Sequence, residues 1–307
     1  MQRCGGLQRC DSGRRNVHER VPVAQPMRLR ARLGWVFGLA GALVACGGDD
    51  DSADDALQLV APAELTDAAD HVLDARNVDD FQEGHIEGAC PIDEGQLRTV
   101  VDGIEGQAVS REDAWAVFGA AGLDPDDTVV VTAADNGTDP ARIAWTLRYY
   151  GHQGDVLLLD GGMDAYAAQG LPVAAGTGPM SKPYQGGATR LNLRVDQQWM
   201  LDHLGDGNVA VFDVRAADEF ASGHIPGAIN VNWEDNKNPD GSFRSNEEVR
   251  ALHGNPGAKT LVVYCRTGSR AAVSWALLTR AGYGDVRLYD GSWTEWGNDP
   301  DTPKERG

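Results

Sequence analysis

The feature that most constrains the fold is an internal repeat. Residues 73–89 (LDARNVDDFQEGHIEGA) recur as 212–228 (FDVRAADEFASGHIPGA) at a constant offset of 139. Further along, residues 145–161 match 275–291 at Trp, Leu, Asp and Gly positions, now at an offset of 130. A period this long favours two homologous globular domains over a solenoid, whose units span about 20 to 50 residues.

The length of 307 residues agrees with two domains that each bury a core. Residues 174–183 (AAGTGPMSKP) lie between the copies and are rich in Gly and Pro, as linkers are. The predicted boundaries are a first domain at 57–175, a linker at 176–190 and a second domain at 191–307.

Within each copy, short apolar segments alternate with helical patterns. Residues 209–213 and 260–264 are apolar without alternation, which is typical of buried strands in a parallel sheet, and 287–289 resemble a third strand. Residues 269–281 lie between two of these strands and carry an apolar helical face. The predicted fold class is therefore α/β, with two tandem domains, each an open, mainly parallel sheet flanked by helices.

The beginning of the chain has the pattern of an export signal. An Arg-rich stretch precedes an apolar run at 33–45 (LGWVFGLAGALVA) that is too short to span a bilayer stably, and Cys46 follows. The ending Leu-Val-Ala-Cys resembles the bacterial lipobox, in which the cysteine is acylated, although a plain secretory signal or a short anchor would share most of this pattern. We expect a lipoprotein signal peptide within 1–45, lipidation at Cys46 and an acidic tether at 46–56.

This interpretation places the protein in the bacterial cell envelope, lipid-anchored and facing the periplasm. Gly47 rather than Asp after the cysteine favours the outer membrane. The signal fits best when it starts at Met27, so residues 1–26 form an upstream extension.

Charge excludes two classes of partner. Residues 1–45 hold eight Arg and two acidic residues, which leaves 19 basic and 44 acidic residues in the rest, a net charge of −25. Such an acidic body repels phosphate backbones and anionic lipids, so we expect no nucleic-acid binding, and membrane contact only through the lipid anchor. A small anionic substrate would need a local positive site.

Two cysteines remain beyond the lipobox, Cys90 and Cys265, in a compartment that oxidises thiols. Either they pair or at least one stays a thiol for chemistry. Cys90 follows Gly-Ala on an apolar stretch, which favours a buried core thiol.

The second cysteine lies in the segment 265–270 (CRTGSR), between a predicted buried strand and a predicted helix. Ligands of open α/β sheets bind at such strand ends. Loop N–H groups and the positive end of the helix dipole would stabilise a thiolate there, and a glycine lets the backbone turn its N–H groups inward. The predicted site residues are Cys265 as nucleophile, with Arg266, Thr267, Gly268, Ser269 and Arg270 around the substrate.

At this point the sequence resembles the rhodanese family of sulfurtransferases in its tandem-domain form. The resemblance covers about 57–296 and rests on the Asp-x-Arg strand ends, both Gly-His-Ile-x-Gly-Ala segments, the Cys-Arg-x-Gly loop and the closing Asp-Gly turns. It implies transfer of a sulfane sulfur from a small anionic donor to a thiophilic acceptor, cyanide or a thiol, through a persulfide on Cys265. It implies no cofactor and no metal, and we expect a monomer.

Two other functions share parts of this pattern. In protein phosphatases and arsenate reductases, five residues separate the loop cysteine from the arginine that closes the loop. Here four residues separate Cys265 from Arg270. The shorter loop suits a single sulfur atom better than a tetrahedral phosphate. A non-enzymatic sulfur carrier or partner-binding lipoprotein needs no multiple turnover and remains the alternative function.

The first copy lacks the nucleophile, because Ala133 aligns with Cys265. In the resembling family the inactive domain helps to wall the pocket, which makes Arg76 and Arg142 candidate contributors. Asp213 and Arg215 are predicted to support the site through a salt bridge that orders nearby loops. His85 and His224 are predicted to hold loops by hydrogen bonds and not to bind metal.

This sequence departs from the family pattern at two positions that bind the sulfur donor. Thiosulfate-specific relatives often carry Cys-Arg-Lys-Gly, whereas Thr267 stands here in place of Lys, and Glu219 stands where the tandem family has a substrate-binding Arg. Arg266 argues against mercaptopyruvate, so thiosulfate sulfurtransferase is the expected activity and 3-mercaptopyruvate is less expected. Arg270 either replaces the missing charge or pairs with a surface acid.

Overall fold

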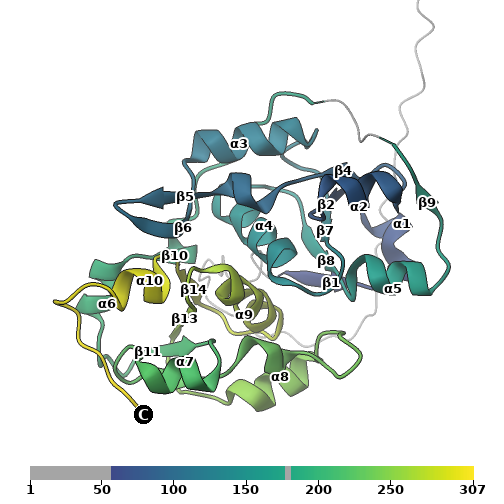
Figure 1. Cartoon of the computed structure of the whole chain (residues 1–307). Helices are drawn as coiled ribbons and strands as arrows, with labels where there is room; N and C mark the ends of the chain where they lie inside the picture. Colours follow the sequence, from purple (N-terminus) through teal and green to yellow (C-terminus); the bar gives the residue numbers. More distant parts are fainter. Residues whose placement is uncertain (1–56, 177–180) are drawn as a thin grey trace, which may run out of the picture. The chain divides into compact units, whose positions relative to one another are not determined.

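The computed structural model describes residues 57–176 and 181–307 (Figure 1). The predicted signal peptide at 1–45, Cys46 and the tether at 46–56 lie outside the described residues, as does part of the linker, residues 177–180. Within the described part of the chain, no helix combines the length and apolar character that crossing a membrane requires.

The first half of the repeat is built on a five-stranded parallel sheet of order β1-β8-β7-β2-β4. Its strands are β1 (Gln58–Val60), β2 (His71–Asp74), β4 (Cys90–Pro91), β7 (Val129–Thr132) and β8 (Val156–Leu159). The α-helices are α1 (Leu65–Ala68), α2 (Val78–Glu83), α3 (Arg111–Ala120), α4 (Thr138–Tyr149) and α5 (Gly162–Ala168). Short pairs and 3₁₀ turns complete it: β3 (His85–Ile86) with β9 (Val173–Ala174), the hairpin β5 (Arg98–Val101) and β6 (Ile104–Ala108), η1 (Pro62–Glu64) and η2 (Glu94–Leu97).

The second half repeats this architecture with a parallel sheet of order β10-β14-β13-β11-β12. Its strands are β10 (Arg194–Val195), β11 (Val209–Asp213), β12 (Ile229–Asn230), β13 (Thr260–Tyr264) and β14 (Val286–Tyr289). Its helices are α6 (Gln197–Asp202), α7 (Ala217–Ser222), α8 (Asn246–His253), α9 (Ser269–Arg280) and α10 (Ser292–Trp296), with turns η3 (Leu191–Leu193) and η4 (Trp233–Asn236). The predicted class of two tandem α/β domains with parallel sheets is confirmed.

Burial on both faces explains why the central strands lack polar alternation. In β13, Leu261 and Val263 pack into one core cluster, while Val262 and Tyr264 pack into another on the opposite face of the sheet. Successive side chains of a strand point to opposite faces, so a strand covered on both sides must be apolar throughout. Cys265 continues this alternation and belongs to the same cluster as Leu261 and Val263.

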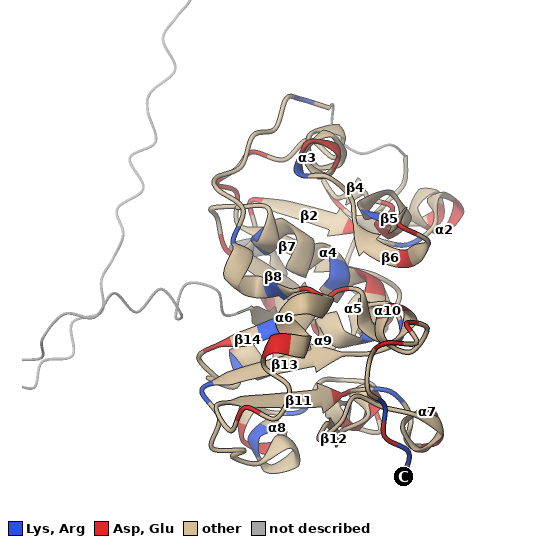
Figure 2. Ribbon diagram, turned by 90° about the vertical axis from the view of Figure 1, so that its left-hand side faces the viewer, with Lys and Arg blue, Asp and Glu red and all other residues tan. Residues whose placement is uncertain are grey.

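That cluster is shared by the two halves. It contains Trp145 of α4 and Trp275 of α9, both fully buried, and the two helices pack against each other between the sheets (Figures 1 and 2). Small residues such as Ala144 and Ala272 allow the helix backbones to approach closely. The interface is therefore a continuous hydrophobic core and not a surface contact between independent domains.

Each half also sends a turn across to the other. The β5–β6 hairpin of the first half reaches the second, where the Ala108 N–H donates to Asp290 Oδ2 at 2.9 Å. In return, the segment after η4 reaches the first half, where the Phe243 N–H donates to Asp160 Oδ1 at 3.0 Å. Asp160 and Asp290 are the equivalent residues of the repeat, so the exchange is reciprocal.

A buried ion pair reinforces this contact on one side. Arg142 of α4 places Nη1 2.7 Å from Asp290 Oδ1, and both side chains are fully buried. Arg194 Nε lies 3.3 Å from the other carboxylate oxygen, and its Nη2 donates to Gln107 Oε1 at 2.9 Å. A buried charge without a partner is costly, so Arg142 and Asp290 tie the halves together.

We predict that Asp290→Ala lowers the free energy of unfolding by about 3 to 5 kcal/mol, because it leaves the Arg142 guanidinium buried and uncompensated. Denaturant titration measures the change. The control is Asp124→Ala, which breaks the exposed pair with Lys182 at 2.6 Å and is expected to cost at most about 1 kcal/mol. Equal losses in both variants would contradict the role given to Asp290.

Candidate active site

The segment 265–270 follows β13, the middle strand of the second sheet, and includes the first two residues of α9, the helix that packs against α4. β13 ends at Tyr264 and α9 begins at Ser269, so the predicted strand and helix are confirmed, the helix ending at Arg280. Cys265 thus stands at the carboxyl end of a central parallel strand, where ligands of open α/β sheets bind.

The sulfur of Cys265 faces the loop's own backbone. The Gly268 N–H donates to Cys265 Sγ at 3.1 Å, and the residue is almost fully buried. Gly268 has φ +91°, the left-handed region that a glycine adopts without strain, and it is the N-cap of α9. This turn directs a backbone N–H and the positive end of a twelve-residue helix at the sulfur, and such dipoles interact favourably with negative charge.

The first residues of α10 hold the other side of the loop. Ser292 Oγ accepts the Cys265 N–H at 3.3 Å and donates to the Tyr289 carbonyl at 2.8 Å. The N–H groups of Trp293 and Thr294 donate to the carbonyls of Cys265 and Arg266, each at 3.0 Å. These bonds hold the Cys265 and Arg266 carbonyls on the side of α10, while the Gly268 N–H faces the sulfur.

Arg270 pairs with the acid that stands where the tandem family has an Arg. Its Nη1 and Nη2 donate to Glu219 Oε2 and Oε1 at 2.6 and 3.0 Å, a bidentate pair that is part-buried. The hydrogen bonds from Arg270 hold the pKa of Glu219 below its usual range, while Glu219, and the sulfur of Cys265 to a smaller extent, raise the pKa of Arg270. Of the two roles predicted for Arg270, pairing with an acid is present, and it occurs beside the sulfur.

Asp213 and Arg215 form the predicted salt bridge. Arg215 Nη2 donates to Asp213 Oδ2 at 2.5 Å and to the Gly223 carbonyl at 2.6 Å, and both residues are buried. The guanidinium also stacks on Trp293, 4.5 Å from the ring centroid. Arg215 therefore orders the 223 turn and the residue after Ser292, and its charge is already balanced.

The first half reaches the loop through a residue that the sequence analysis missed. Arg98 of the β5–β6 hairpin donates from Nη2 to the Thr267 carbonyl at 3.3 Å. Gly106 of the same hairpin has φ +84°, and a Cβ there would lie 2.7 Å from the Thr267 carbonyl oxygen. The hairpin therefore packs directly on the reactive loop.

Arg76 and Arg142, which were predicted to help form the wall of the pocket, lie in other positions. Arg76 pairs with Asp74 at 2.6 Å and donates to the Gly84 carbonyl, in the same arrangement as Arg215 in the second half. Arg142 lies beneath the loop, where a Cβ on Gly268 would come within 2.7 Å of its Nη1. It supports the turn from the buried side.

The corresponding loop of the first half carries no thiol. Ala133 follows β7 as Cys265 follows β13, and its carbonyl accepts the Met163 N–H at 2.8 Å, matching the bond between Cys265 and Trp293. Asn136 fills this loop, donating to Asp160 Oδ1 and to the Gly241 carbonyl of the other half at 2.7 and 2.9 Å. The loop is used to hold the two halves together.

The remaining predicted residues have structural positions. His85 and His224 hold their loops as expected, each through Nδ1 to the carbonyl of Phe81 or Phe220, at 2.8 and 2.9 Å. Cys90 is a free, buried thiol 2.8 Å from His71 Nε2, and burial raises the pKa of Cys90 to about 12. That thiol is protonated at neutral pH.

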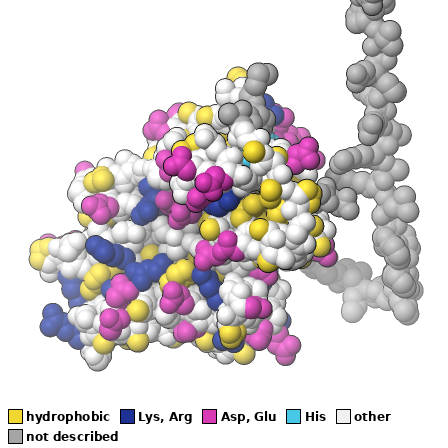
Figure 3. All heavy atoms as spheres, turned by 45° about the vertical axis from the view of Figure 1, so that its right-hand side comes forward, with side chains coloured by type: hydrophobic (Ala, Val, Ile, Leu, Met, Phe, Trp, Pro, Cys, Tyr) yellow, Lys and Arg dark blue, Asp and Glu magenta, His cyan; other side chains and the backbone are white. Residues whose placement is uncertain are grey.

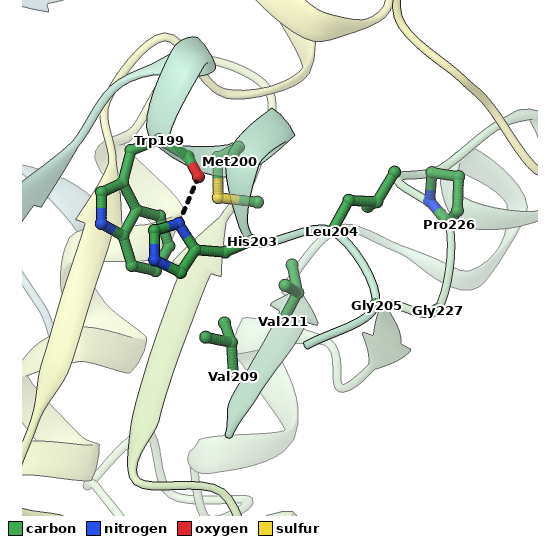
Figure 4. Close-up of a pocket in the computed structure, with 9 residues that line it drawn as sticks. All are labelled: Trp199, Met200, His203, Leu204, Gly205, Val209, Val211, Pro226 and Gly227. Atoms are coloured by element: carbon green, nitrogen blue, oxygen red, sulfur yellow. Dashed lines mark hydrogen bonds between the residues drawn. The ribbon is translucent and has the colours of Figure 1, made fainter. Parts of the chain in front are cut away.

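Two hollows in the second half differ in chemistry. The first, of about 450 Å³, lies beside the reactive loop and is lined by Arg266, Glu219 and Trp293 among others. The second, of about 70 Å³, is lined mainly by apolar side chains of α6, β11 and the turn between them; there His203 stacks on Trp199 and donates to its carbonyl at 2.8 Å (Figure 4). Neither hollow is lined by Cys265 itself, and it is the first that borders the cysteine loop, through Arg266 and Trp293.

Basic side chains gather over the lower part of the molecule in Figure 3, the part that holds the second sheet in Figure 1. Acidic side chains lie among them and across the rest of that face. The basic side chains of this face are thus most frequent on the half that holds the thiol.

These features define a two-domain α/β protein with a single cysteine loop at the end of the central strand of its second sheet. The family of the rhodanese-like domain matches residues 55–169 and 196–299. The chain belongs to the rhodanese family, in its tandem form, and is of the sulfurtransferase type.

Relatives of known name agree with this assignment. The chain is 34% identical over 250 residues to a thiosulfate sulfurtransferase of Corynebacterium glutamicum, covering 73% of this chain and 80% of that protein. It is also 34% identical over 255 residues to the sulfur carrier protein TtuD of Thermus thermophilus, covering 74% and 87%.

Solved structures share the fold. The crystal structure of YnjE matches with a TM-score of 0.72 and 28% identity, covering 81% of this chain and 68% of that one. A structure of EanB with ergothioneine also matches with a TM-score of 0.72, at 23% identity and with coverage of 81% and 70%.

We predict that Arg98→Ala slows alkylation of Cys265 by iodoacetamide at neutral pH by roughly two- to tenfold, the equivalent of one lost hydrogen bond. Without Arg98 the Thr267 carbonyl lacks its hydrogen bond, so the Thr267–Gly268 peptide can rotate. The Gly268 N–H that it carries then no longer points at the Cys265 sulfur. Arg111→Ala is the matched control, because this exposed arginine of the first half pairs with its neighbour Glu112 and lies over the Trp115 ring, away from the cysteine loop. An unchanged rate in Arg98→Ala would show that the hairpin does not order the loop.

The ratio of alkylation rates with iodoacetate and iodoacetamide tests the Glu219–Arg270 pair. Glu219→Gln removes one negative charge beside the sulfur, so the ratio should rise roughly two- to fivefold, and Arg270→Ala should lower it. Because the folded pKa of Glu219 is lowered, the pair opens only when pH falls below the usual range of glutamate, about 4.3, and the wild-type ratio should stay flat between pH 8 and 6.

Glu247→Gln, an exposed acid on α8, is the control and should leave the ratio unchanged. A ratio that is the same in Glu219→Gln and wild type would mean that the pair does not set the potential at the sulfur.

Proposed function

We propose that this protein is a thiosulfate sulfurtransferase, which moves a sulfane sulfur from thiosulfate or a related donor to a thiophilic acceptor through a persulfide on Cys265. The observation that carries the proposal is the contact between the Gly268 N–H and the buried sulfur of Cys265 at 3.1 Å, at the start of α9. A persulfide carries its negative charge on the outer sulfur, and such a charge needs donors at short range.

The first step loads the cysteine. The Cys265 thiolate attacks the outer sulfur of thiosulfate, the sulfur–sulfur bond of the donor breaks, and sulfite leaves with the electron pair. Backbone N–H groups of the loop stabilise the thiolate before the attack and the persulfide after it.

The second step transfers the outer sulfur from Cys265 to the acceptor. A thiophilic acceptor, cyanide or a thiolate, attacks the outer sulfur of the persulfide, and the bond to Cys265 breaks. The electron pair returns to Cys265 as thiolate, so the cycle closes without an external oxidant or reductant.

Two observations favour thiosulfate over 3-mercaptopyruvate as donor. Arg266 follows the cysteine at the position where mercaptopyruvate enzymes favour a small residue. The relative from Corynebacterium glutamicum is named for thiosulfate. Steady-state assays with both donors, side by side, decide the preference.

A sulfur carrier is the second candidate, favoured by the name of the Thermus thermophilus relative. A carrier is loaded once and discharged to a partner, whereas an enzyme turns over many times with free cyanide or thiol. Sulfite release that stops at one equivalent per protein in excess acceptor would favour the carrier.

We predict that incubation with thiosulfate adds one sulfur atom, about 32 Da, to the intact protein. The gain should be lost in Cys265→Ala and kept in Cys90→Ala, because the Cys90 thiol is buried and protonated. An adduct that persists in Cys265→Ala would overturn the assignment of the nucleophile.

We further propose that the protein is held at the bacterial outer membrane, facing the periplasm, by a lipid on Cys46. The support is the arginine-rich, apolar and Leu-Val-Ala-Cys pattern at residues 28–46.

We predict that the wild-type chain is recovered with membranes of its bacterial host and that Cys46→Ala moves it to the soluble periplasmic fraction. Cys90→Ala is the control for loss of a cysteine and should stay with the membranes. Recovery of the wild-type chain in the soluble fraction would mean that Cys46 carries no lipid and that the N-terminal segment is a plain secretory signal.

A further inference from the structure

The hollow beside the reactive loop is formed by three segments of the second half. The 215–223 segment and α7 contribute Arg215, Asp218 and Glu219, the loop contributes Arg266, and α10 contributes Trp293. Its volume of about 450 Å³ is large enough for a small organic molecule. It borders the loop directly, because Arg266 follows Cys265 and the Trp293 N–H donates to the Cys265 carbonyl.

Two of its charged side chains are already balanced by protein partners. Arg215 is bound to Asp213 within 2.5 Å, and Glu219 is bound to both Nη atoms of Arg270. Neither offers a free charge to a ligand.

Two opposite charges remain. Within residues 57–176 and 181–307, the structure gives the side chains of Arg266 and Asp218 no ion pair and no hydrogen bond, and both residues are exposed. The hollow therefore presents one free cation and one free carboxylate beside a sulfur-bearing loop. A dianion such as thiosulfate matches Arg266 but is repelled by Asp218, whereas a zwitterion matches both.

We infer that this hollow binds the sulfur acceptor, and that the acceptor is a small thiol carrying both a carboxylate and an ammonium group. Arg266 binds the carboxylate, through the planar fork that suits such groups, and Asp218 binds the ammonium. This inference rests on the proposed function, since it needs a persulfide on Cys265. It makes Asp218 a residue that determines acceptor specificity.

The transfer is balanced within the two reactants. The acceptor thiolate forms a bond to the outer sulfur of the persulfide, the bond between that sulfur and Cys265 Sγ breaks, and its electron pair leaves Cys265 as thiolate. The acceptor departs as a persulfide.

The experiment measures single-turnover discharge of the full chain, loaded beforehand with thiosulfate and followed by intact mass. Four acceptors are compared at equal thiolate concentration: L-cysteine with both charges, 3-mercaptopropionate with the carboxylate only, cysteamine with the ammonium only, and neutral 2-mercaptoethanol. L-cysteine should discharge the persulfide fastest.

Two variants test which side chain binds the ammonium group and which binds the carboxylate of the acceptor. Asp218→Asn should slow discharge to L-cysteine and cysteamine roughly two- to fivefold, the range of one exposed ion pair, and leave 3-mercaptopropionate no slower. Arg266→Gln should slow L-cysteine and 3-mercaptopropionate but not cysteamine. Glu247→Gln, an exposed acid on α8, is the matched control for loss of one negative charge.

Failure of this inference is distinguishable from failure of the proposed function. If thiosulfate adds no sulfur to Cys265, the proposed function is wrong and the inference falls with it. If the persulfide forms but all four thiols discharge it at the same rate, or if Asp218→Asn changes all four rates alike, the inference is overturned and the proposed function stands.

Discussion

The buried pair between Arg142 and Asp290 is the interaction on which the arrangement of the two halves depends. Both side chains are fully buried, and the two residues come from different copies of the repeat. Neither copy could bury its own charge without the other, because an uncompensated charge in a core is strongly destabilising. The pair also lies beneath Gly268, since a Cβ there would approach both Arg142 Nη1 and Asp290 Oδ1. The turn that aims an N–H at the sulfur is therefore supported by the interface.

Duplication explains why one half can act as scaffold for the other. The two copies exchange turns reciprocally, through Ala108 onto Asp290 and through Phe243 onto Asp160. In the second copy the loop after the central strand holds Cys265, whereas in the first the equivalent loop holds Ala133 and binds the opposite half through Asn136. The first copy also contacts the cysteine loop of the second, because Arg98 donates to the Thr267 carbonyl.

How far the sequence predicts this structure depends on the range of the interactions. Strands 209–213 and 260–264 were predictable because two covered faces demand unbroken apolar runs, and the helix from Ser269 because its apolar face is periodic. The Asp213–Arg215 bridge was predictable because its partners are two residues apart. The contact of Arg98 with Thr267 spans 169 residues, and nothing in the local pattern of the hairpin indicates it. The role of Arg270 stayed open for the same reason, since its partner Glu219 belongs to another helix.

The charge near Cys265 depends on which arginines have carboxylate partners, more than on the composition of the whole chain. Beyond residue 45 the chain carries a net charge of −25, yet the cysteine loop carries Arg266 and Arg270 and borders a hollow that Arg215 also lines. Arg215 is balanced by Asp213 and Arg270 by Glu219, so only Arg266 keeps an exposed, unpaired charge among the described residues near the loop. The stabilisation of a sulfur anion must then come mainly from the fixed dipoles of Gly268 and α9, which cannot be screened by counter-ions as an exposed side chain can. Dipoles fixed in the backbone can act on a negative charge at the sulfur of an acidic protein without attracting anions to the rest of its surface.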